Sequence, residues 1–423
     1  MNRLFLLLLL LPGGLLAQWQ PGTTYREYVW TTPDTGEAFL RVGGRYGYAA
    51  QPGKLPEHLQ RGQDLILPHD LDLGGATRAT VTLEKVQSHE DSRDLRIAVN
   101  GHPAIPVPEP ATIPVPQTEY MYHTDLTVDI PLEQLRAGAD NRFRLTLDTV
   151  QRWGWPQNVF YALIFRVYYA DEAPLPFPVG STELPQQFYL TPGGAAGEGE
   201  KAFARVDYVL NGREADWSGR GVRERTHWQT FRGQPHHTVG SSDHPETDFA
   251  VLVDTEWLPE QKEEGFTLQF RARDTSGIYH VSNPTSPLTL RPRPYTVQVY
   301  GGEAPRNWVT RSGEFEQTLL VNDSVALARA IQLNWVSWSP CYSNGVFLND
   351  HLIWDREGDC YVYATHSPTY EGAAVRYLQA GENTIRTALT PLFRGQMVHG
   401  MEVQWPGFQL KVKYGRAAPA AGH

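Results

Sequence analysis

Cysteine, long apolar runs and clusters of positive charge are all scarce in this chain. Two cysteines occur among 423 residues, and 37 lysines and arginines face 47 aspartates and glutamates. Nucleic-acid phosphates demand a basic stripe, and none stands out, so we expect no nucleic-acid partner. A zinc site needs more ligands than one cysteine pair offers. The composition therefore argues against nucleic-acid binding and against a cysteine-zinc site.

The one long apolar run lies at the N-terminus, where Asn2 and Arg3 precede "LFLLLLLLPGGLLA". A positive start, a leucine core and a small residue at Ala17 are typical of a secretory signal peptide. The core is too short to span a bilayer, and no other segment approaches about 20 apolar residues. We predict a signal peptide over residues 1–17, cleaved after Ala17. The protein is then secreted, periplasmic or on the cell surface, without a membrane span.

The two cysteines predict a disulfide between Cys341 and Cys360, because bridges are the default pairing in exported proteins. Such a bridge closes a loop of about 20 residues, worth roughly 3 kcal/mol in the chain-entropy model. The alternative is two free buried thiols.

Recognisable catalytic motifs are also lacking. The chain has no G-x-S-x-G, no H-E-x-x-H, no P-loop and no dinucleotide fingerprint, so we expect no cofactor. The best metal candidates are His236, His237 and His244 in "HHTVGSSDH", since imidazoles close together bind zinc or copper. The alternative for these histidines is a solvated loop.

Long helix-period patterns are hard to find, whereas glycine (38) and proline (32) are plentiful. Short alternating runs between Pro/Gly/Asn/Asp clusters dominate, which predicts an all-β protein. Four phrases recur in the same order. They are "TRATVTLEKV" and "ARAIQLNWV", "LRIAVNGH" and "GVFLNDH", "LRAGADNRFRLTL" and "LQAGENTIRTAL", and "LIFRVYY" and "FQLKVKY". We interpret them as two copies of one domain.

Asparagines mark the turns of both copies. Asn-Gly at Asn100 and Asn-Asp at Asn349 tolerate positive φ and predict hairpin turns. Asn141 and Asn383 follow a glycine and can hydrogen-bond loop backbone, a structural role rather than a ligand role. Strand–"VNG"–strand followed by "L-x-x-G-x-N" resembles the galactose-binding-domain-like jelly rolls, β-sandwiches that accompany many glycoside hydrolases. The resemblance implies jelly rolls at 18–170 and 293–415.

The segment between the copies has a different pattern. A linker-like stretch, "DEAPLPFPVG", opens residues 171–292, and "FAVLVDTEWLPEQKEEGFTLQFRARDTSG" alternates as strands. The segment resembles a bacterial immunoglobulin-like or fibronectin-type module, which implies a spacer. We therefore expect three β-sandwiches (jelly roll, Ig-like, jelly roll) and a flexible tail over 416–423.

Aromatic residues give the strongest ligand signal. "QRWGWPQN" places Trp153 and Trp155 on one side of an extended segment, with Gln157 and Asn158 beside them. Sugar rings pack their C–H faces on such side chains. In copy two, the corresponding candidates are Trp335, Tyr361 and Tyr363. Each ring has a core alternative, and since Trp335 and Trp338 are three apart in a strand, at least one of them is expected in the core.

The leading hypothesis is a non-catalytic exported protein that binds a glycan or a cell-surface polysaccharide. The first alternative is an enzyme, either a hydrolase acting on glycans or a metal-dependent enzyme that uses the three histidines. Glycosidases need two carboxylates at a set separation, and the sequence alone does not single out a pair. The second alternative is a structural or assembly protein of the cell surface whose aromatic residues bury domain interfaces.

Overall fold

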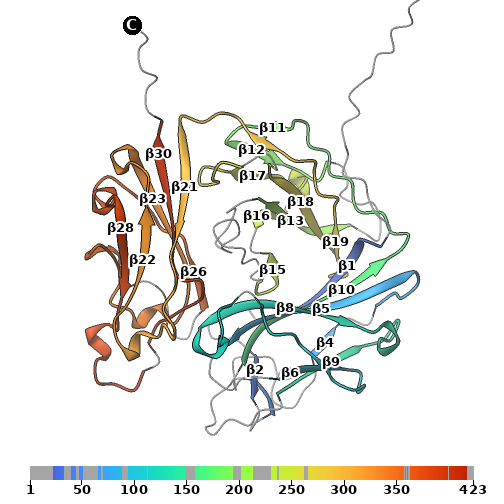
Figure 1. Ribbon diagram of the computed structural model, residues 1–423. Coiled ribbons are helices and arrows are strands. Elements are labelled where there is room, and N and C mark those ends of the chain that lie inside the picture. The colour runs from blue at the N-terminus through green and yellow to red at the C-terminus, as the bar shows by residue number, and fades with distance from the viewer. Residues whose placement is uncertain are drawn as a thin grey trace, which may run out of the picture.

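The computed structural model describes residues 22–32, 40–43, 47–50, 65–67, 70–87, 94–111, 113–147, 158–193, 202–212, 230–235, 238–261, 265–356, 358, 360, 363–398 and 400–416. Within them the protein is all-β, as the sequence predicts (Figure 1). The predicted signal peptide over residues 1–17 lies outside these residues, as does the predicted flexible tail except for residue 416. Short 3-10 helices connect strands at Gln117–Glu119, Leu132–Gln134, Pro245–Thr247, Thr310–Ser312, Val325–Leu327, Pro340–Tyr342, Ala374–Tyr377 and Pro391–Phe393.

The N-terminal region contains β1 (Thr24–Thr31), β2 (Leu40–Gly43), β3 (Gly47–Ala50), β4 (Leu65–Leu67), β5 (Ala76–Gln87), β6 (Leu95–Val99), β7 (Ile105–Pro106), β8 (Tyr122–Ile130), β9 (Asn141–Leu147) and β10 (Asn158–Tyr169). One sheet runs β1-β10-β5-β8, and a second runs β4-β9-β6-β7. Alternating apolar residues such as Leu83, Phe143 and Phe165 meet between the sheets in one hydrophobic cluster. The opposite face of the first sheet is therefore left to contact other parts of the chain.

The C-terminal region contains β21 (Tyr295–Gly301), β22 (Phe315–Val321), β23 (Ala328–Trp338), β24 (Val346–Leu348), β25 (His351–Trp354), β26 (Tyr363–His366), β27 (Thr369–Glu371), β28 (Gly381–Thr387), β29 (Glu402–Val403) and β30 (Gln409–Gly415). Its sheets run β21-β30-β23, with β26, β27 and β29 also on β23, and β22-β28-β24-β25. This order matches the N-terminal region strand for strand, from β1-β10-β5 to β21-β30-β23 and from β4-β9-β6-β7 to β22-β28-β24-β25. The match is what the sequence repeat predicts.

The two predicted asparagine turns also have the same contacts. Asn100 and Asn349 have φ of +50° and +46°, as a two-residue hairpin turn requires. Asn100 donates to the Asn141 side chain at 2.9 Å and to a loop carbonyl at 2.7 Å. Asn349 donates to the Asn383 side chain at 2.8 Å and to a loop carbonyl at 2.7 Å. The structural role predicted for these asparagines is confirmed, while the assignment of both regions to galactose-binding-domain-like jelly rolls stays a prediction.

The middle region contains β11 (Glu183–Leu184), β12 (Gln187–Leu190), β13 (Phe203–Asn211), β14 (Thr230–Phe231), β15 (Gln234–Pro235), β16 (Thr238–Ser242), β17 (Val251–Asp254), β18 (Thr267–Asp274), β19 (Tyr279–Val281) and β20 (Thr289–Leu290). It has a hydrophobic cluster of its own, which includes Tyr208, Leu268 and Phe270. Its sheet β16-β13-β18-β19 continues into β1, because β19 pairs with Arg26 and Glu27. The N-terminal and middle regions are therefore joined by main-chain pairing as well as by the chain itself, and the boundaries predicted for three separate domains stay a prediction.

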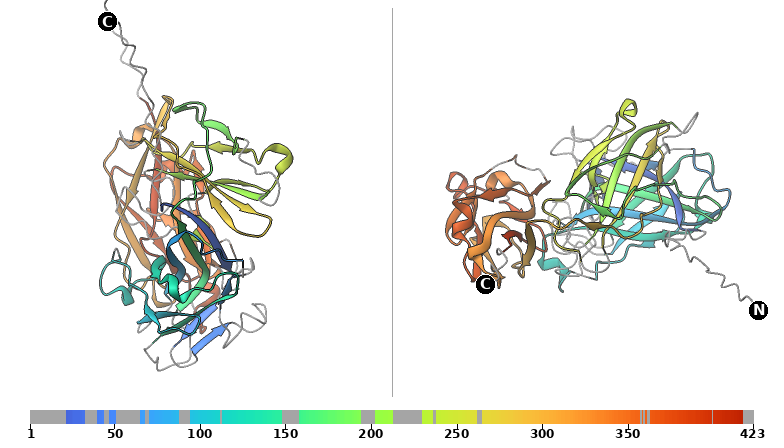
Figure 2. Two further views of the ribbon diagram at one scale, coloured as in Figure 1. Left: turned by 90° about the vertical axis from the view of Figure 1, so that its right-hand side faces the viewer. Right: turned by 90° about the horizontal axis from the view of Figure 1, so that it is seen from above.

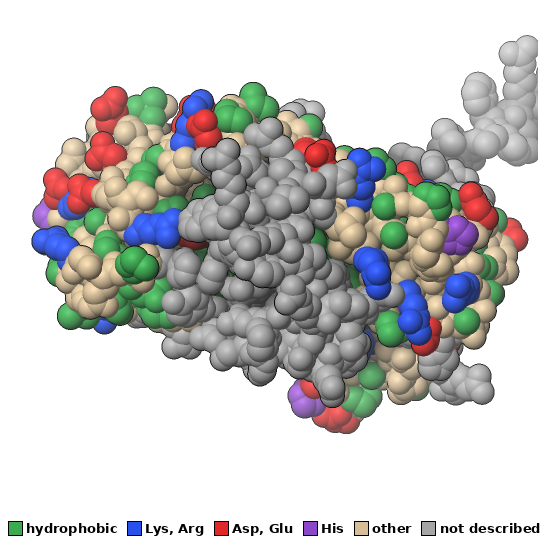
Figure 3. Space-filling view, turned by 90° about the horizontal axis from the view of Figure 1, so that it is seen from below, with side chains coloured by type: hydrophobic (Ala, Val, Ile, Leu, Met, Phe, Trp, Pro, Cys, Tyr) green, Lys and Arg blue, Asp and Glu red, His purple; other side chains and the backbone are tan. Residues whose placement is uncertain are grey.

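The C-terminal region packs beside the other two (Figures 1 and 2). Tyr122 at the start of β8 forms an isolated bridge with Trp405, and Arg306 forms an ion pair with Glu119 at 2.6 Å. Acidic and basic side chains are interspersed on the face shown in Figure 3, where the described residues present no large area of one sign. The structure describes no helix that is long and apolar enough to cross a membrane.

The predicted disulfide between Cys341 and Cys360 is present, with the two Cα atoms 5.1 Å apart. Cys341 lies in the 3-10 helix Pro340–Tyr342 that follows β23, and Cys360 lies shortly before β26. The bridge therefore ties together two neighbouring segments of the C-terminal region.

Candidate functional site

The outer face of the N-terminal sheet carries charged side chains that are buried. Glu84 of β5 pairs directly with Asp125 of β8, so both carboxyls lie on the same side of the sheet. On β10 the register shifts between Phe160 and Ala162, which leaves Tyr161 at a β-bulge. Bulges re-aim side chains, and Tyr161 packs on this outer face.

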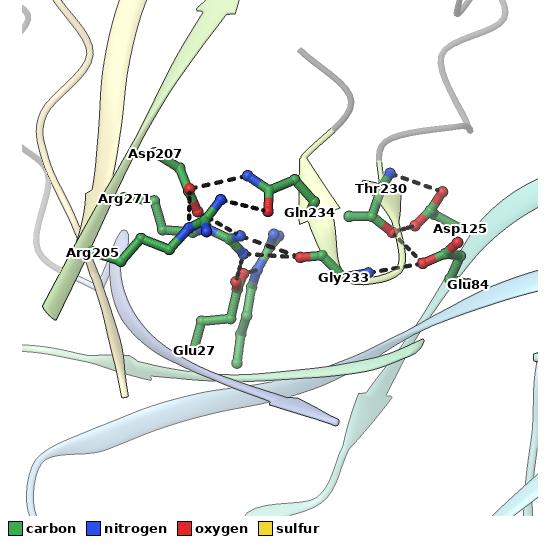
Figure 4. Close-up of polar contacts among 10 residues, drawn as sticks. Glu27, Glu84, Asp125, Arg205, Asp207, Thr230, Gly233, Gln234 and Arg271 are labelled. Carbon is green, nitrogen blue, oxygen red and sulfur yellow. Dashed lines mark hydrogen bonds and ion pairs between the residues drawn. The ribbon is translucent and has the colours of Figure 1, made fainter. Parts of the chain in front are cut away.

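A hairpin from the middle region covers the two carboxyls (Figure 4). The Gly233 amide donates a hydrogen bond to Glu84 at 3.0 Å, and the Thr230 amide donates to Asp125 at 3.3 Å. The Thr230 hydroxyl donates to Asp125 and, at 3.4 Å, to Glu84. These donors compensate for placing two carboxyls side by side without water.

The C-terminal region closes the other side of the same surface. The Tyr363 ring of β26 lies 4.9 Å from the His123 ring and 5.5 Å from the Tyr161 ring, between centroids. Trp338 of β23 pairs with Tyr363 on one side and with Glu402 of β29 on the other. We call this group the junction cluster, and its members are Glu84, His123, Asp125, Tyr161, Tyr363 and Glu402.

Burial sets the protonation of the first two members. Desolvation raises the pKa of Glu84 to about 7, although the backbone amides of Arg232 and Gly233 oppose it. Desolvation lowers the pKa of His123 to about 3. His123 Nε2 and Glu84 Oε1 are 3.1 Å apart, so the two groups share a hydrogen bond in which the imidazole stays neutral near pH 7.

Glu402 differs from the other carboxyls because it is not held by a partner. Among the described residues its carboxyl has no hydrogen bond or ion pair, and burial raises its pKa to about 7, with Arg311 acting in the opposite direction. Burial raises the pKa of the Tyr161 hydroxyl, Arg232 lowers it, and the charges of Glu84 and Glu402 raise it further. Glu402 is thus close enough to act on Tyr161. A carboxyl in this state donates a hydrogen bond when protonated and accepts one when ionised.

A second buried polar group lies between the N-terminal and middle regions. Arg271 of β18 donates to Glu27 and, at 3.0 Å, to Asp207. Arg166 contacts Glu27 at 2.8 Å, and Arg205 contacts Asp207 at 2.8 Å. The arginines hold the pKa values of both acids below their usual range despite burial. Every charge here has an opposite partner, so this group is structural.

The structure describes two of the aromatic residues predicted to bind sugar, Trp335 and Tyr363. Trp153, Trp155, Gln157 and Tyr361 lie outside the described residues, as does the side chain of Asn158. Trp335 is fully buried and stacks on His366 with ring centroids 4.4 Å apart.

Trp335 is therefore a core residue, because its ring packs between the two C-terminal sheets and presents no face to a ligand. Tyr363 is 2% exposed and lies in the junction cluster instead.

Of the three predicted metal ligands, the structure describes His244. His236 and His237 lie outside the described residues, whereas His244 is exposed and contacts Glu246 at 2.9 Å and Asp243 at 3.4 Å. Within the part of the chain that the structure describes, no three His, Cys, Asp or Glu side chains form a metal-binding group. Metal binding at these histidines remains untested.

A cavity of about 580 Å³ lies elsewhere, between β1, the end of β10 and β19. Three of its charged groups already have partners: Arg26 contacts Glu172 at 2.9 Å, and His280 contacts Asp274 at 2.9 Å. We therefore place the candidate site at the junction cluster, where the Glu402 carboxyl is unengaged.

Comparison with known proteins adds little. No protein-family model matches the chain, and no curated protein does. Similar solved structures include BuGH86 in complex with neoagarooctaose (9% identity, 51% of this chain and 28% of that chain, TM-score 0.21). A β-porphyranase of glycoside hydrolase family 86 from Bacteroides plebeius gives 9% identity over 51% of this chain and 31% of that chain, with a TM-score of 0.21. Recombinant peptide:N-glycanase F gives 7% identity over 94% and 97% of the two chains, with a TM-score of 0.18.

The match therefore spans less than a third of either of the first two proteins. With TM-scores of 0.21 or lower, these likenesses carry no argument about the fold or the activity of this chain.

Sequence reasoning missed most of the junction cluster. Glu84 and Asp125 lie on polar faces of alternating strands, which are typical of solvent-exposed faces. The segment "HGMEVQWPG" has no clear alternation, so the sequence does not place Glu402 on a particular face. One usable signal existed: "FRGQ", from Phe231, places a glycine where a tight hairpin turn requires it.

Proposed function

We propose that this protein binds carbohydrate at the junction cluster, without catalysis. The observation that carries the proposal is Glu402, a largely buried carboxyl with no hydrogen bond or ion pair among the described residues, next to Trp338. Sugar-binding sites combine apolar ring surface with a few convergent polar groups. Tyr161 and Tyr363 are buried beneath this carboxyl. The ring surface that the proposal needs would therefore come from the predicted residues Trp153, Trp155 and Tyr361.

The strands that follow the two predicted aromatic loops meet at this cluster. β10 begins at Asn158, directly after the "QRWGWPQ" segment, and β26 begins at Tyr363, shortly after Tyr361. Val159 and Tyr363 belong to one hydrophobic cluster. Sugar contacts by Trp153, Trp155, Gln157 and Tyr361 therefore stay predictions that fit this location.

Export is part of the proposal. The disulfide is compatible with a protein outside the cytoplasm, where such bridges persist. We expect a mature N-terminus at Gln18, which mass spectrometry of the purified protein would detect.

The test begins with a glycan array on the mature chain, followed by titration calorimetry with the best ligand. We expect a dissociation constant in the micromolar-to-millimolar range, because few groups converge. Glu402→Gln should weaken binding at least about tenfold, since the loss of one charged hydrogen bond costs roughly 1.5–3 kcal/mol. Glu382→Gln on β28 is the matched control, because its side chain is exposed on the other C-terminal sheet. An array without any ligand, or unchanged affinity in Glu402→Gln, would overturn the proposal.

The predicted aromatic platform has its own test. Replacing Trp153 and Trp155 together with alanine should abolish binding while the melting temperature stays close to that of the parent protein. A loss of several kcal/mol of stability would instead show that these rings are core.

A second candidate function is glycan hydrolysis, and the state of Glu402 favours it. A carboxyl with a pKa of about 7 is protonated often enough near neutral pH to act as a general acid. Incubation of array-positive glycans with the protein, followed by mass spectrometry, distinguishes the two functions. Cleavage products that disappear in Glu402→Gln would establish hydrolysis, and intact glycan would support binding alone.

A further inference from the structure

The β14–β15 hairpin of the middle region is built to lie close against the N-terminal sheet. Arg232 and Gly233 form its two-residue turn, with φ of +50° and +73°. This turn type matches the twist of the flanking strands and favours glycine at its second position. A Cβ at Gly233 would lie 2.6 Å from a Val29 methyl and 2.7 Å from a Thr31 methyl. Only glycine allows the turn to approach β1 this closely.

One side of the hairpin faces the junction cluster. The Gly233 amide and the Thr230 hydroxyl both donate to the same oxygen of Glu84, at 3.0 Å and 3.4 Å. The Arg232 amide also acts on Glu84, and its guanidinium lies over the Tyr161 ring at 5.6 Å. Consecutive amides directed at one carboxylate form the kind of nest that binds anions.

The other side of the hairpin is held by the buried ion pairs of the middle region. The Gly233 carbonyl accepts hydrogen bonds from both terminal nitrogens of Arg271, at 3.3 Å and 3.2 Å. Gln234 donates to Asp207 at 3.0 Å. Figure 4 shows the result: the main chain of one residue, Gly233, links Arg271 on one side to Glu84 on the other.

We propose that the β14–β15 hairpin sets the charge carried by Glu84, and that Arg271 is a positioning residue that holds the hairpin in place for this role. The middle region is then part of the site and not a spacer. This inference rests on the proposed function only in taking the junction cluster as the site.

The groups that face Glu84 make the direction of the effect clear. His123 and Asp125 of β8, Tyr161 of β10 and Tyr363 of β26 supply no positive charge near pH 7. Apart from the hydrogen bond shared with His123, the stabilisation of an ionised Glu84 therefore comes from the hairpin, through the amides of Arg232 and Gly233, the Arg232 charge and the Thr230 hydroxyl. Burial opposes ionisation and raises the pKa of Glu84 to about 7. The loss of a hairpin donor therefore changes the fraction of ionised Glu84 at physiological pH.

The experiment follows the Glu84 carboxyl by NMR in full-length protein labelled with carboxyl-¹³C glutamate, with Glu84→Gln assigning the signal. Thr230→Val keeps the side-chain shape but removes the hydroxyl donor. We expect its Glu84 titration midpoint to rise by about half a pH unit, because the contact with Glu84 is long and the single hydroxyl hydrogen is shared with Asp125. Arg271→Lys keeps the positive charge beside Glu27 and Asp207 but loses the forked contact with Gly233. It should raise the midpoint by about half a pH unit.

Thr127→Val is the matched control. Thr127 lies on β8 two residues after Asp125 and contacts Thr82 at 2.8 Å. Thr127 makes no described contact with the hairpin, so the Glu84 titration midpoint in Thr127→Val should equal that of the parent protein.

An unchanged midpoint in Thr230→Val would overturn the role of the hairpin. An unchanged midpoint in a folded Arg271→Lys protein would overturn the role of Arg271 alone. An equal rise in Thr127→Val would show that any polar loss in the sheet has this effect and would also contradict the inference. The titration needs no ligand, so it tests the role of the hairpin even if the protein binds no carbohydrate. Likewise, an unchanged titration would not affect the result of the glycan array.

Discussion

The N-terminal and C-terminal regions share a strand order and the same asparagine contacts, yet they contribute different chemistry to the junction. The N-terminal sheet supplies paired acids, Glu84 and Asp125, which are held by donors from the hairpin. The C-terminal sheet supplies rings and Glu402, whose carboxyl has no hydrogen bond or ion pair with the residues that the structure describes. The difference teaches that the repeated residues maintain the scaffold, whereas the site is built from positions at which the two regions diverge.

The largest expected effect tests the shared scaffold. Asn100→Ala and Asn349→Ala should each reduce the free energy of unfolding by about 3 kcal/mol. Each variant loses side-chain hydrogen bonds, leaves a buried asparagine partner unsatisfied and forces alanine to a positive φ. Denaturant unfolding measures the losses.

Asn349→Gly separates the two causes, since glycine tolerates the turn and loses only the hydrogen bonds. A difference of more than about 2 kcal/mol between the two alanine variants would break the comparison between the regions.

The C-terminal region contains the disulfide, and the N-terminal region contains no cysteine. Replacing Cys341 and Cys360 with alanine should cost about 2–3 kcal/mol, because the bridge closes a segment of 19 residues. Hydrogen exchange should show increased opening around β26 and unchanged protection in β5 and β10. Loss of protection in both regions would mean that the bridge supports the whole molecule and not one region.

The next effect concerns pH. The pKa of Glu84 and of Glu402 is raised to about 7, so the stability associated with each neutral carboxyl is present at low pH and is lost as pH rises from about 4.5 to 7. The pKa values of His123 and His366 are lowered to about 3 and 4, so their contribution is lost as pH falls below about 6.5. The two effects oppose each other between pH 4.5 and 6.5.

Glu402→Gln removes one of the opposing effects. Its stability should therefore fall more steeply on acidification than that of the parent protein, by about 2 kcal/mol between pH 7 and pH 4.5. Thermal unfolding across this range measures the slope. Parallel curves for the two proteins would show that Glu402 titrates normally.

The smallest effect is a gain in stability. Lys85 is fully buried on β5, its ammonium has no hydrogen bond among the described residues, and burial lowers its pKa. Its ammonium lies 5.8 Å from the Tyr122 ring, and the charge of Glu109 opposes the effect of burial on its pKa. Lys85→Met keeps the length of the side chain and should raise stability by about 1 kcal/mol. A decrease in stability of similar size would instead show that the Lys85 ammonium stabilises the folded protein.

Local sequence was sufficient for the parts of the fold that short-range chemistry dictates. Alternation predicted an all-β protein, the asparagine turns predicted equivalent hairpins, and compartment and number predicted the Cys341–Cys360 bridge. The spacing of Trp335 and Trp338 predicted that at least one ring lies in the core, and Trp335 does. Each of these inferences depends on residues that are close in the chain or on the composition as a whole.

The site itself was decided by the tertiary structure. Glu84 lies on a face that alternation marks as polar, and polar faces of strands usually meet water. Its burial comes from the hairpin, in which Gly233 lies 149 residues later in the chain, and from β23 and β26 of the C-terminal region. The sequence by itself determined which residues alternate and where the chain turns. Only the packing of distant segments decided which polar face loses water, because desolvation depends on what covers a surface and not on the residues that form it.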